Sequence, residues 1–237
     1  MSRDPIEERG GVNQYRVADN DPVYYVDPLG LKIHILQSAN MGDYFGRPDP
    51  KYEPIDAPNE YIKKVVEALT AAVGDCLTIL QESYGPYQII KYEKKPGFEV
   101  AQCKCRPCVI KLMKAIDDDR VHWIFNTRRR REGFDQVRSM PVSPDETRNY
   151  VPFNPSIDLP TMDGAGNQGP NQPISFGALL WHELIGHGSE GAGHPDPRSN
   201  PWNRIPDISP QVDPTIAIEN EYRECVGEPL RWRHYYY

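Results

Sequence analysis

The hexapeptide at residues 182–187 reads His182-Glu183-Leu184-Ile185-Gly186-His187. Two imidazoles and a carboxylate fall on one expected helix, and neutral histidine nitrogens are good zinc ligands. The usual motif of this kind is His-Glu-x-x-His, in which the two histidines share one helix face. Here the histidines are five residues apart, so a regular α-helix would point them about 140° away from each other.

A π-type turn would correct this divergence, because it takes up one extra residue and such turns concentrate at functional sites. We expect the turn at Gly186, since glycine has no Cβ to obstruct it. The preceding residues, Ile174 to Trp181, are uncharged and mostly apolar, which is typical of a buried helix. Buried histidine and glutamate need partners, and one metal ion would satisfy all three motif residues. The alternative is a buried helix that carries two unrelated histidines.

A second helix is expected at residues 214–226, with Asp213 as its N-cap and Gly227 just after its C-terminus. This helix carries two carboxylates that are candidates for a third metal ligand, Glu219 and Glu221. On a helical wheel both can reach inward, Glu221 at about 60° from Ile218 of the apolar stripe and Glu219 at about 100° on its other side. The wheel therefore leaves both open and slightly favours Glu221. The other carboxylate would be exposed or would hold a histidine tautomer.

Residues 182–189 resemble the His-Glu-x-x-Gly-His-Gly-Ser segment of the dipeptidyl peptidase III family, in which the longer motif binds zinc on a helix. Residues 221–223 resemble the third-ligand segment of that family and of the clostridial neurotoxin light chains. A stretched metzincin pattern would instead make His194 the third ligand, but no methionine follows for the turn that metzincins need. The resemblance implies that Glu183 is a proton-accepting carboxylate. It also implies three zinc ligands, which are His182, His187 and Glu221.

The end of the chain carries a further resemblance. The run Glu219-Asn220-x-x-Arg223 through Pro229-Leu230-Arg231 resembles the end of the effector zinc metallopeptidases that enteropathogens inject into host cells. An arginine or tyrosine from this region could stabilise a tetrahedral oxyanion near the zinc. The alternative is a tail packed on the surface of the domain.

Residues 2–31 resemble the end of the RHS-repeat-associated core, the border that precedes the variable C-terminal toxin of polymorphic toxins. In that family the core forms a shell around the toxin and is cut by its own aspartyl activity after an Asp-Pro-x-Gly-Leu element. The matching element is Asp27-Pro28-Leu29-Gly30-Leu31, which places the cut between Leu31 and Lys32. We therefore expect residues 1–31 to be a remnant of the core and residues 32–237 to be the toxin domain.

These resemblances together imply an α+β, zincin-like metallopeptidase domain whose active-site helix precedes a second, ligand-bearing helix. We expect a secreted effector, delivered into a target cell by a route such as type VI secretion, that cleaves a protein there. A cognate immunity protein and the RHS shell are the other expected partners. Two alternatives stay open: a metal-dependent hydrolase of a non-peptide bond, and a non-catalytic binding toxin with a structural metal.

Composition argues against two other classes of protein. The net charge of −7 disfavours a nucleic-acid binder, and the basic run Arg128–Arg131 is expected on a solvated loop. No apolar run is long enough for a transmembrane helix.

The five cysteines are an odd number, which argues against a complete disulfide framework. The cluster Cys103–Cys108 could bind a metal, or form one disulfide beside a free thiol.

Hydrophobic periodicity predicts the remaining elements. Strands are expected at residues 31–37, 87–92, 97–103 and 121–125, and helices at residues 61–84 and 108–116. Residues 150–154 are predicted to form an edge strand beside the active site, where a peptide could add by β-augmentation.

Overall fold

The computed structural model describes residues 33–36, 52–54, 57–85, 87–129, 138–155, 157–163, 165–193 and 213–232. The chain divides into two units, residues 1–30 and 31–237, and every described stretch belongs to the second. The expected core remnant, its cut after Leu31 and the candidate ligand His194 therefore lie outside the described residues.

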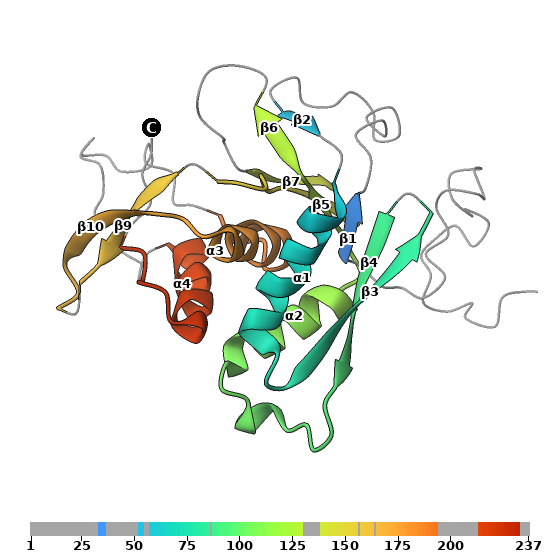
Figure 1. The fold of residues 1–237 in the computed structure, drawn as a ribbon, viewed down its shortest axis with the longest axis horizontal. Helices are drawn as coiled ribbons and strands as arrows, with labels where there is room; N and C mark the ends of the chain where they lie inside the picture. Colours follow the sequence, from blue (N-terminus) through green and yellow to red (C-terminus); the bar gives the residue numbers. More distant parts are fainter. Residues whose placement is uncertain are drawn as a thin grey trace, which may run out of the picture. The chain divides into compact units, whose positions relative to one another are not determined.

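A six-stranded sheet forms the frame of the domain, in the order β3-β4-β1-β5-β8-β7 (Figure 1). Its strands are β1 (Ile33–Leu36), β3 (Leu77–Tyr84), β4 (Tyr87–Lys94), β5 (Val121–Phe125), β7 (Arg138–Ser143) and β8 (Glu146–Tyr150). The neighbouring strands β1, β5 and β8 are parallel, whereas β3, β4 and β7 run antiparallel to the strands beside them.

Five helices accompany this sheet, among the described residues, besides a short 3-10 turn. They are α1 (Asn59–Val73), α2 (Arg106–Asp117), α3 (Phe176–Trp181), a π-helix (His182–Ser189) and α4 (Pro214–Val226). The mixture of sheet and helices confirms the predicted α+β class. No helix in the described part of the chain is long and apolar enough to cross a bilayer.

The two faces of the sheet carry different side chains, because successive residues of a strand point to opposite sides. Ile33 and Ile35 of β1 belong to the main core together with residues of α1, α2 and α3, and these helices lie on one side of the sheet in Figure 1. The alternate residue Leu36 joins Trp123 and Phe125 of β5 in a second, largely aromatic cluster. The main core thus lies between sheet and helices, and the π-helix packs against β5, β7 and β8.

Two small sheets complete the described strands. β2 (Tyr52–Pro54) pairs with β6 (Thr127–Arg129), and β9 (Asp158–Met162) pairs with β10 (Gln168–Pro173). The expected loop at Arg128–Arg131 is therefore wrong for its first two residues, which belong to β6.

The predicted helix at residues 61–84 is too long. Helix α1 ends at Val73, and Leu77–Tyr84 form strand β3 instead. The change of element is visible in the burial pattern, since Leu77 and Ile79 are buried while the residue between them is exposed. Leu77 fits a helical period counted from Val73, and for this reason the apolar spacing alone extends the helix into the strand.

Two predicted strands also differ from the structure. Residues 97–103 contain a 3-10 turn at Val100–Gln102, which follows Gly97 with a φ of 73°. The predicted edge strand at residues 150–154 is wrong, because β8 ends at Tyr150 and β7 lies outside it in the sheet. Strands β1, β4 and β5 and helix α2 confirm the other predictions to within a few residues.

The cysteines form two disulfides, Cys76–Cys103 and Cys105–Cys225, and Cys108 is a buried free thiol. The expected metal site and the expected disulfide within the Cys103–Cys108 cluster are therefore wrong, since Cys103 and Cys105 each bond to a cysteine outside it, whereas the expected free thiol is present. Burial, together with a nearby carboxylate, raises the pKa of the Cys108 thiol to about 12. The bridges connect the residues before α2 with the end of α1 and with the end of α4.

Candidate metal centre

The motif residues lie on a π-helix that continues α3 from His182 to Ser189. A hydrogen bond from Glu190 N to Ile185 O, at 2.8 Å, spans five residues and is of the π type. The predicted extra residue is therefore present, and the two imidazole ring centres lie 4.9 Å apart. Gly186 permits close packing here, because a Cβ on it would lie 2.8 Å from Thr215 Cγ2 at the start of α4.

Both ends of the motif-bearing helix have hydrogen-bond partners. Ser175 caps α3, where its side chain accepts a hydrogen bond from Ala178 N at 3.0 Å. At the other end Arg120 donates to the backbone carbonyls of Gly188, at 3.0 Å, and Ser189. A cation at the C-terminal carbonyls stabilises a helix. Groups of the protein itself thus hold both ends of the helix.

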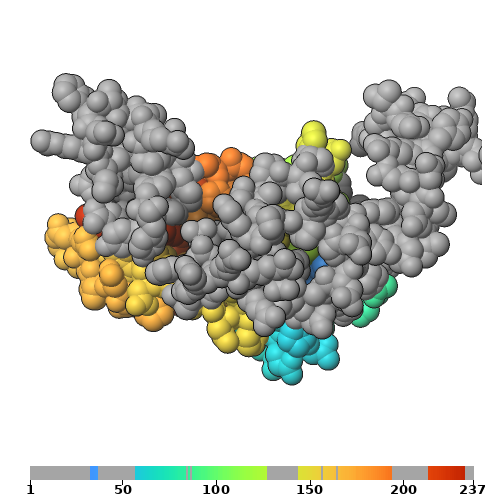
Figure 2. Space-filling model, turned by 90° about the horizontal axis from the view of Figure 1, so that it is seen from above, coloured from blue at the N-terminus to red at the C-terminus, as the bar shows by residue number. Residues whose placement is uncertain are grey.

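His182, Glu183 and His187 form the one group of potential metal ligands within the described stretches, and their ligand atoms all lie within 4.8 Å of one another. His182 is 3% exposed and Glu183 is 4% exposed, whereas His187 is half-buried. In the space-filling view, atoms of the orange stretch that follows α3 reach the surface (Figure 2). The group is therefore largely enclosed, and His187 lies on its more open side.

Hydrogen bonds fix the tautomers of both histidines. His187 Nδ1 lies 2.6 Å from Ala192 O, and it carries the hydrogen because a carbonyl oxygen can only accept. His182 Nδ1 lies 2.9 Å from Glu219 Oε2 and donates to this carboxylate in the same way. In the neutral form of each ring, Nε2 is then the nitrogen with a lone pair, which is the form of histidine that binds a metal.

Glu219 of α4 is fully buried and accepts hydrogen bonds on both oxygens. Oε2 accepts from His182 and, at 2.6 Å, from Arg231 Nη1, while Oε1 accepts from Arg223 Nε at 2.7 Å. Burial by itself would raise the pKa of Glu219, but Arg231, the His182 N–H and Arg223 hold this pKa well below its usual value. Glu219 is therefore ionised, and it orients His182 as outer carboxylates orient metal-binding histidines.

Glu221, the predicted third ligand, does not lie in this cluster. Its Oε2 forms an ion pair with Lys111 of α2 at 2.6 Å, and its side chain is 33% exposed. The structure thus places Glu219, and not Glu221, beside His182.

Helix α4 has the ends that the sequence predicts. Asp213 Oδ1 accepts hydrogen bonds from Thr215 N and Ile216 N, at 3.0 and 3.2 Å. Gly227 follows the last turn with a φ of 78°, in the left-handed region that favours glycine. These ends set the register of the helix and therefore the direction in which Glu219 points.

The sequence assigns no role to Asn220 or Arg231, although both belong to the pattern that resembles the effector metallopeptidases. Asn220 is 9% exposed and Arg231 is 4% exposed, so this part of the chain is no surface tail. The hydrogen-bond partners of Asn220 and Arg231 come from other segments of the chain. The sequence signal that could have identified the two residues is their place in this polar pattern.

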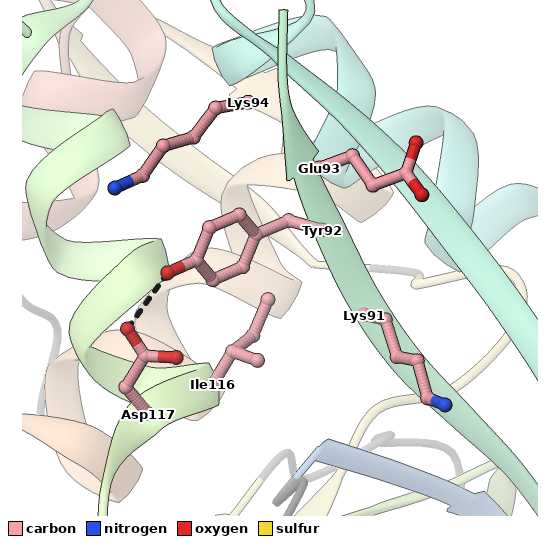
Figure 3. Close-up of a pocket in the computed structure, with 6 residues that line it drawn as sticks. All are labelled: Lys91, Tyr92, Glu93, Lys94, Ile116 and Asp117. Carbon is pink, nitrogen blue, oxygen red and sulfur yellow. Dashed lines mark hydrogen bonds between the residues drawn. The ribbon is translucent and has the colours of Figure 1, made fainter.

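A separate cavity lies between β4 and α2 (Figure 3). It has a volume of about 570 Å³ and is lined by Lys91, Tyr92, Glu93, Lys94, Ile116 and Asp117. Tyr92 points across it and donates a hydrogen bond to Asp117 Oδ2 at 2.8 Å. None of these six residues belongs to the group on the π-helix, so this cavity is separate from the candidate metal centre.

Comparison of the chain with protein-family models, with curated proteins and with solved structures finds no match.

Proposed function

We propose that this chain is a zinc-dependent metallopeptidase with a zincin-like domain. The observation that carries the proposal is the group of His182, Glu183 and His187, whose ligand atoms lie within 4.8 Å of one another. Both histidines have Nδ1 engaged in a hydrogen bond, so the donor set suits a zinc ion. In zinc hydrolases with a motif of this kind, two histidines of one helix bind the zinc and the glutamate beside the first histidine acts as the base.

The two carboxylates near His182 support different roles. Zinc bound at this group would act as a Lewis acid and make the attacking water more acidic. Glu183 Oε1 lies 3.9 Å from His182 Nε2, and this proximity supports Glu183 as the group that accepts a proton from that water and passes it to the leaving amine. Glu219 contacts Nδ1 on the other side of the same ring and orients it.

The edge strand β7 supports a peptide as the substrate. β7 pairs with β8 on one side and is the outermost strand of the six, and it packs against the π-helix. An outer strand can bind an extended peptide through backbone hydrogen bonds. We therefore propose that the substrate adds to β7 rather than to residues 150–154.

The biological role that we propose rests on the resemblance of residues 2–31 to the RHS core border. The domain is a toxin that is released from its shell by a cut after Leu31 and delivered into a target cell. There it cleaves a protein, and a cognate immunity protein protects the producing cell.

Zinc content and substitutions of the three motif residues test the enzymatic proposal. We expect one zinc per chain by elemental analysis of the wild type, with large losses in His182→Ala and His187→Ala. Glu183→Gln should keep the zinc and the fold but lose about 10²-fold or more in peptide-bond cleavage, because the proton acceptor is gone. Glu190→Gln is the matched control, since Glu190 follows the π-helix and pairs with Lys114 at 3.1 Å.

A wild type without zinc would contradict the metal centre. A folded, zinc-loaded Glu183→Gln protein that remains as toxic as the wild type would exclude the hydrolase and favour a binding toxin with a structural metal.

A further inference from the structure

The residues after α4, Glu228–Trp232, form a segment that we call the C-terminal strap. The chain turns at Gly227, and the strap then runs beside β9. Leu230 O accepts a hydrogen bond from Met162 N at 2.7 Å, and Trp232 N donates to Pro160 O at 3.0 Å. The strap is therefore attached to β9 by backbone hydrogen bonds on either side of Arg231.

Asn220 of α4 fixes the backbone of Arg231. Its side-chain Oδ1 accepts from Arg231 N at 2.7 Å, and its Nδ2 donates to Arg231 O at 2.9 Å. One amide side chain thus satisfies both backbone groups of one residue, and the contact is buried. This pairing sets where Arg231 lies relative to Glu219, which directly precedes Asn220 in the helix.

The guanidinium of Arg231 shares an oxygen with the imidazole of His182. Arg231 Nη1 and His182 Nδ1 both bond to Glu219 Oε2, at 2.6 and 2.9 Å. All three side chains are at most 5% exposed. A buried carboxylate requires compensating charge and donors to stay ionised, and Arg231 supplies both at the oxygen that His182 uses.

We propose that Arg231 is a positioning residue for the metal centre and that the C-terminal strap completes this centre. Arg231 acts through Glu219: it holds Oε2 in the direction that keeps the hydrogen on His182 Nδ1 and leaves Nε2 for the metal. The strap is thus part of the site, although it contributes no metal ligand. This inference rests on the proposed function, because it takes His182 to be a zinc ligand.

Arg231→Met and Lys111→Met form a matched pair of variants for the test. Each removes a cation that bonds to a carboxylate of α4, but Lys111 bonds to Glu221 instead of Glu219. Zinc affinity is measured by competition with a chromophoric chelator, and the fold by circular dichroism and thermal unfolding of the metal-free protein. We expect Arg231→Met to weaken zinc binding by about 10- to 100-fold, as changes around metal ligands typically do, and Lys111→Met to leave it unchanged.

A second readout uses metal-free protein. Nitrogen chemical shifts of His182 should report hydrogen on Nδ1 in the wild type and a mixture of tautomers in Arg231→Met. Arg231→Lys keeps a cation beside Glu219 and should recover part of the affinity, and it carries the same test if Arg231→Met does not fold.

The two proposals fail in different ways. A wild type that binds no zinc contradicts the proposed function, and the tautomer measurement then still decides the role of Arg231. Unchanged zinc affinity and an unchanged His182 tautomer in Arg231→Met, with only a lower unfolding temperature, would show that Arg231 merely fastens the strap.

Discussion

At the scale of single residues, the imidazole of His182 lies between two carboxylates, one beside each ring nitrogen. Glu183 faces its Nε2 and Glu219 its Nδ1. In the function that we propose, the first transfers a proton and the second orients the ring. This division follows from geometry, because the two ring nitrogens point in different directions and each has its own partner.

Glu219 and Glu221 of α4 should respond differently to substitution. Glu221→Ala is expected to retain the zinc, because the Glu221 carboxylate bonds to Lys111 outside the cluster. Glu219→Gln is expected to lose about 10- to 100-fold in zinc affinity, because an amide is a weaker acceptor for the His182 N–H. Metal titration of the two purified proteins makes the comparison, and His194→Ala in the same assay tests the remaining ligand candidate.

Loss of zinc from Glu221→Ala with retention in Glu219→Gln would support Glu221 as the third zinc ligand, as predicted from the sequence. It would also mean that α4 turns when the metal binds, since Glu221 lies outside the group in this structure.

At the scale of elements, the contact between the π-helix and the start of α4 brings Glu219 to His182. Gly186 lies where these helices approach, and the side chain of Thr215 occupies the space that a Cβ would need. Trp181 and Tyr222 pack together further along, with ring centres 5.4 Å apart. The sizes of the side chains at these contacts therefore help to set the distance between the two helices.

Gly186→Ala should destabilise the protein by about 1–3 kcal/mol, because its Cβ would meet Thr215 Cγ2 in a packed interior. Thr215→Ser removes that methyl group and keeps the hydroxyl, so the double variant should recover most of the loss. Urea unfolding of the wild type, both single variants and the double variant measures this coupling. Additive losses in the double variant would mean that Gly186 is needed for its backbone conformation and not for space.

The elements that the sequence predicts well are those with local signals. The five-residue spacing of His182 and His187 predicts the π-helix, and Asp213 and Gly227 predict both ends of α4, because each feature depends on nearby residues. The choice between Glu219 and the neighbouring Glu221 could not be made in this way. Their partners Lys111 and Arg231 come from α2 and the strap, and a helical wheel contains no information about them.

At the scale of the whole molecule, covalent bonds join segments that are distant in sequence. The Cys76–Cys103 bridge joins residues that are 27 positions apart in the sequence, and the Cys105–Cys225 bridge joins residues that are 120 positions apart. The second bridge ends on α4, the helix that carries Glu219. Disulfides stabilise a fold mainly by restricting the unfolded chain, with more effect for longer loops.

Reduction should therefore lower the free energy of unfolding by about 2–4 kcal/mol for each bridge. Chemical unfolding with and without a reductant measures the change, and mass spectrometry of alkylated thiols verifies that both bridges have opened. Cys108→Ala is the control, since it removes the free thiol and leaves both bridges in place. An unfolding midpoint that does not move after complete reduction would argue against this pairing of the cysteines.

The resemblance of the first residues leads to a separate prediction for the parent polypeptide. We expect a cut between Leu31 and Lys32, abolished by Asp27→Asn, because the family's cut depends on the aspartate of this element. Mass spectrometry of the full-length parent makes the measurement. An intact junction in the assembled shell would remove the support for release of the domain.

The position of the C-terminal strap has a consequence for synthesis. Ribosomes make a chain from its N-terminus, and domains begin to fold in that order. The sheet and the π-helix emerge before α4 and the strap, so His182 and His187 exist for a time without Glu219 and Arg231. If these partners prepare the histidines for metal, the activity that we propose cannot begin until the strap has left the ribosome, and synthesis itself delays it.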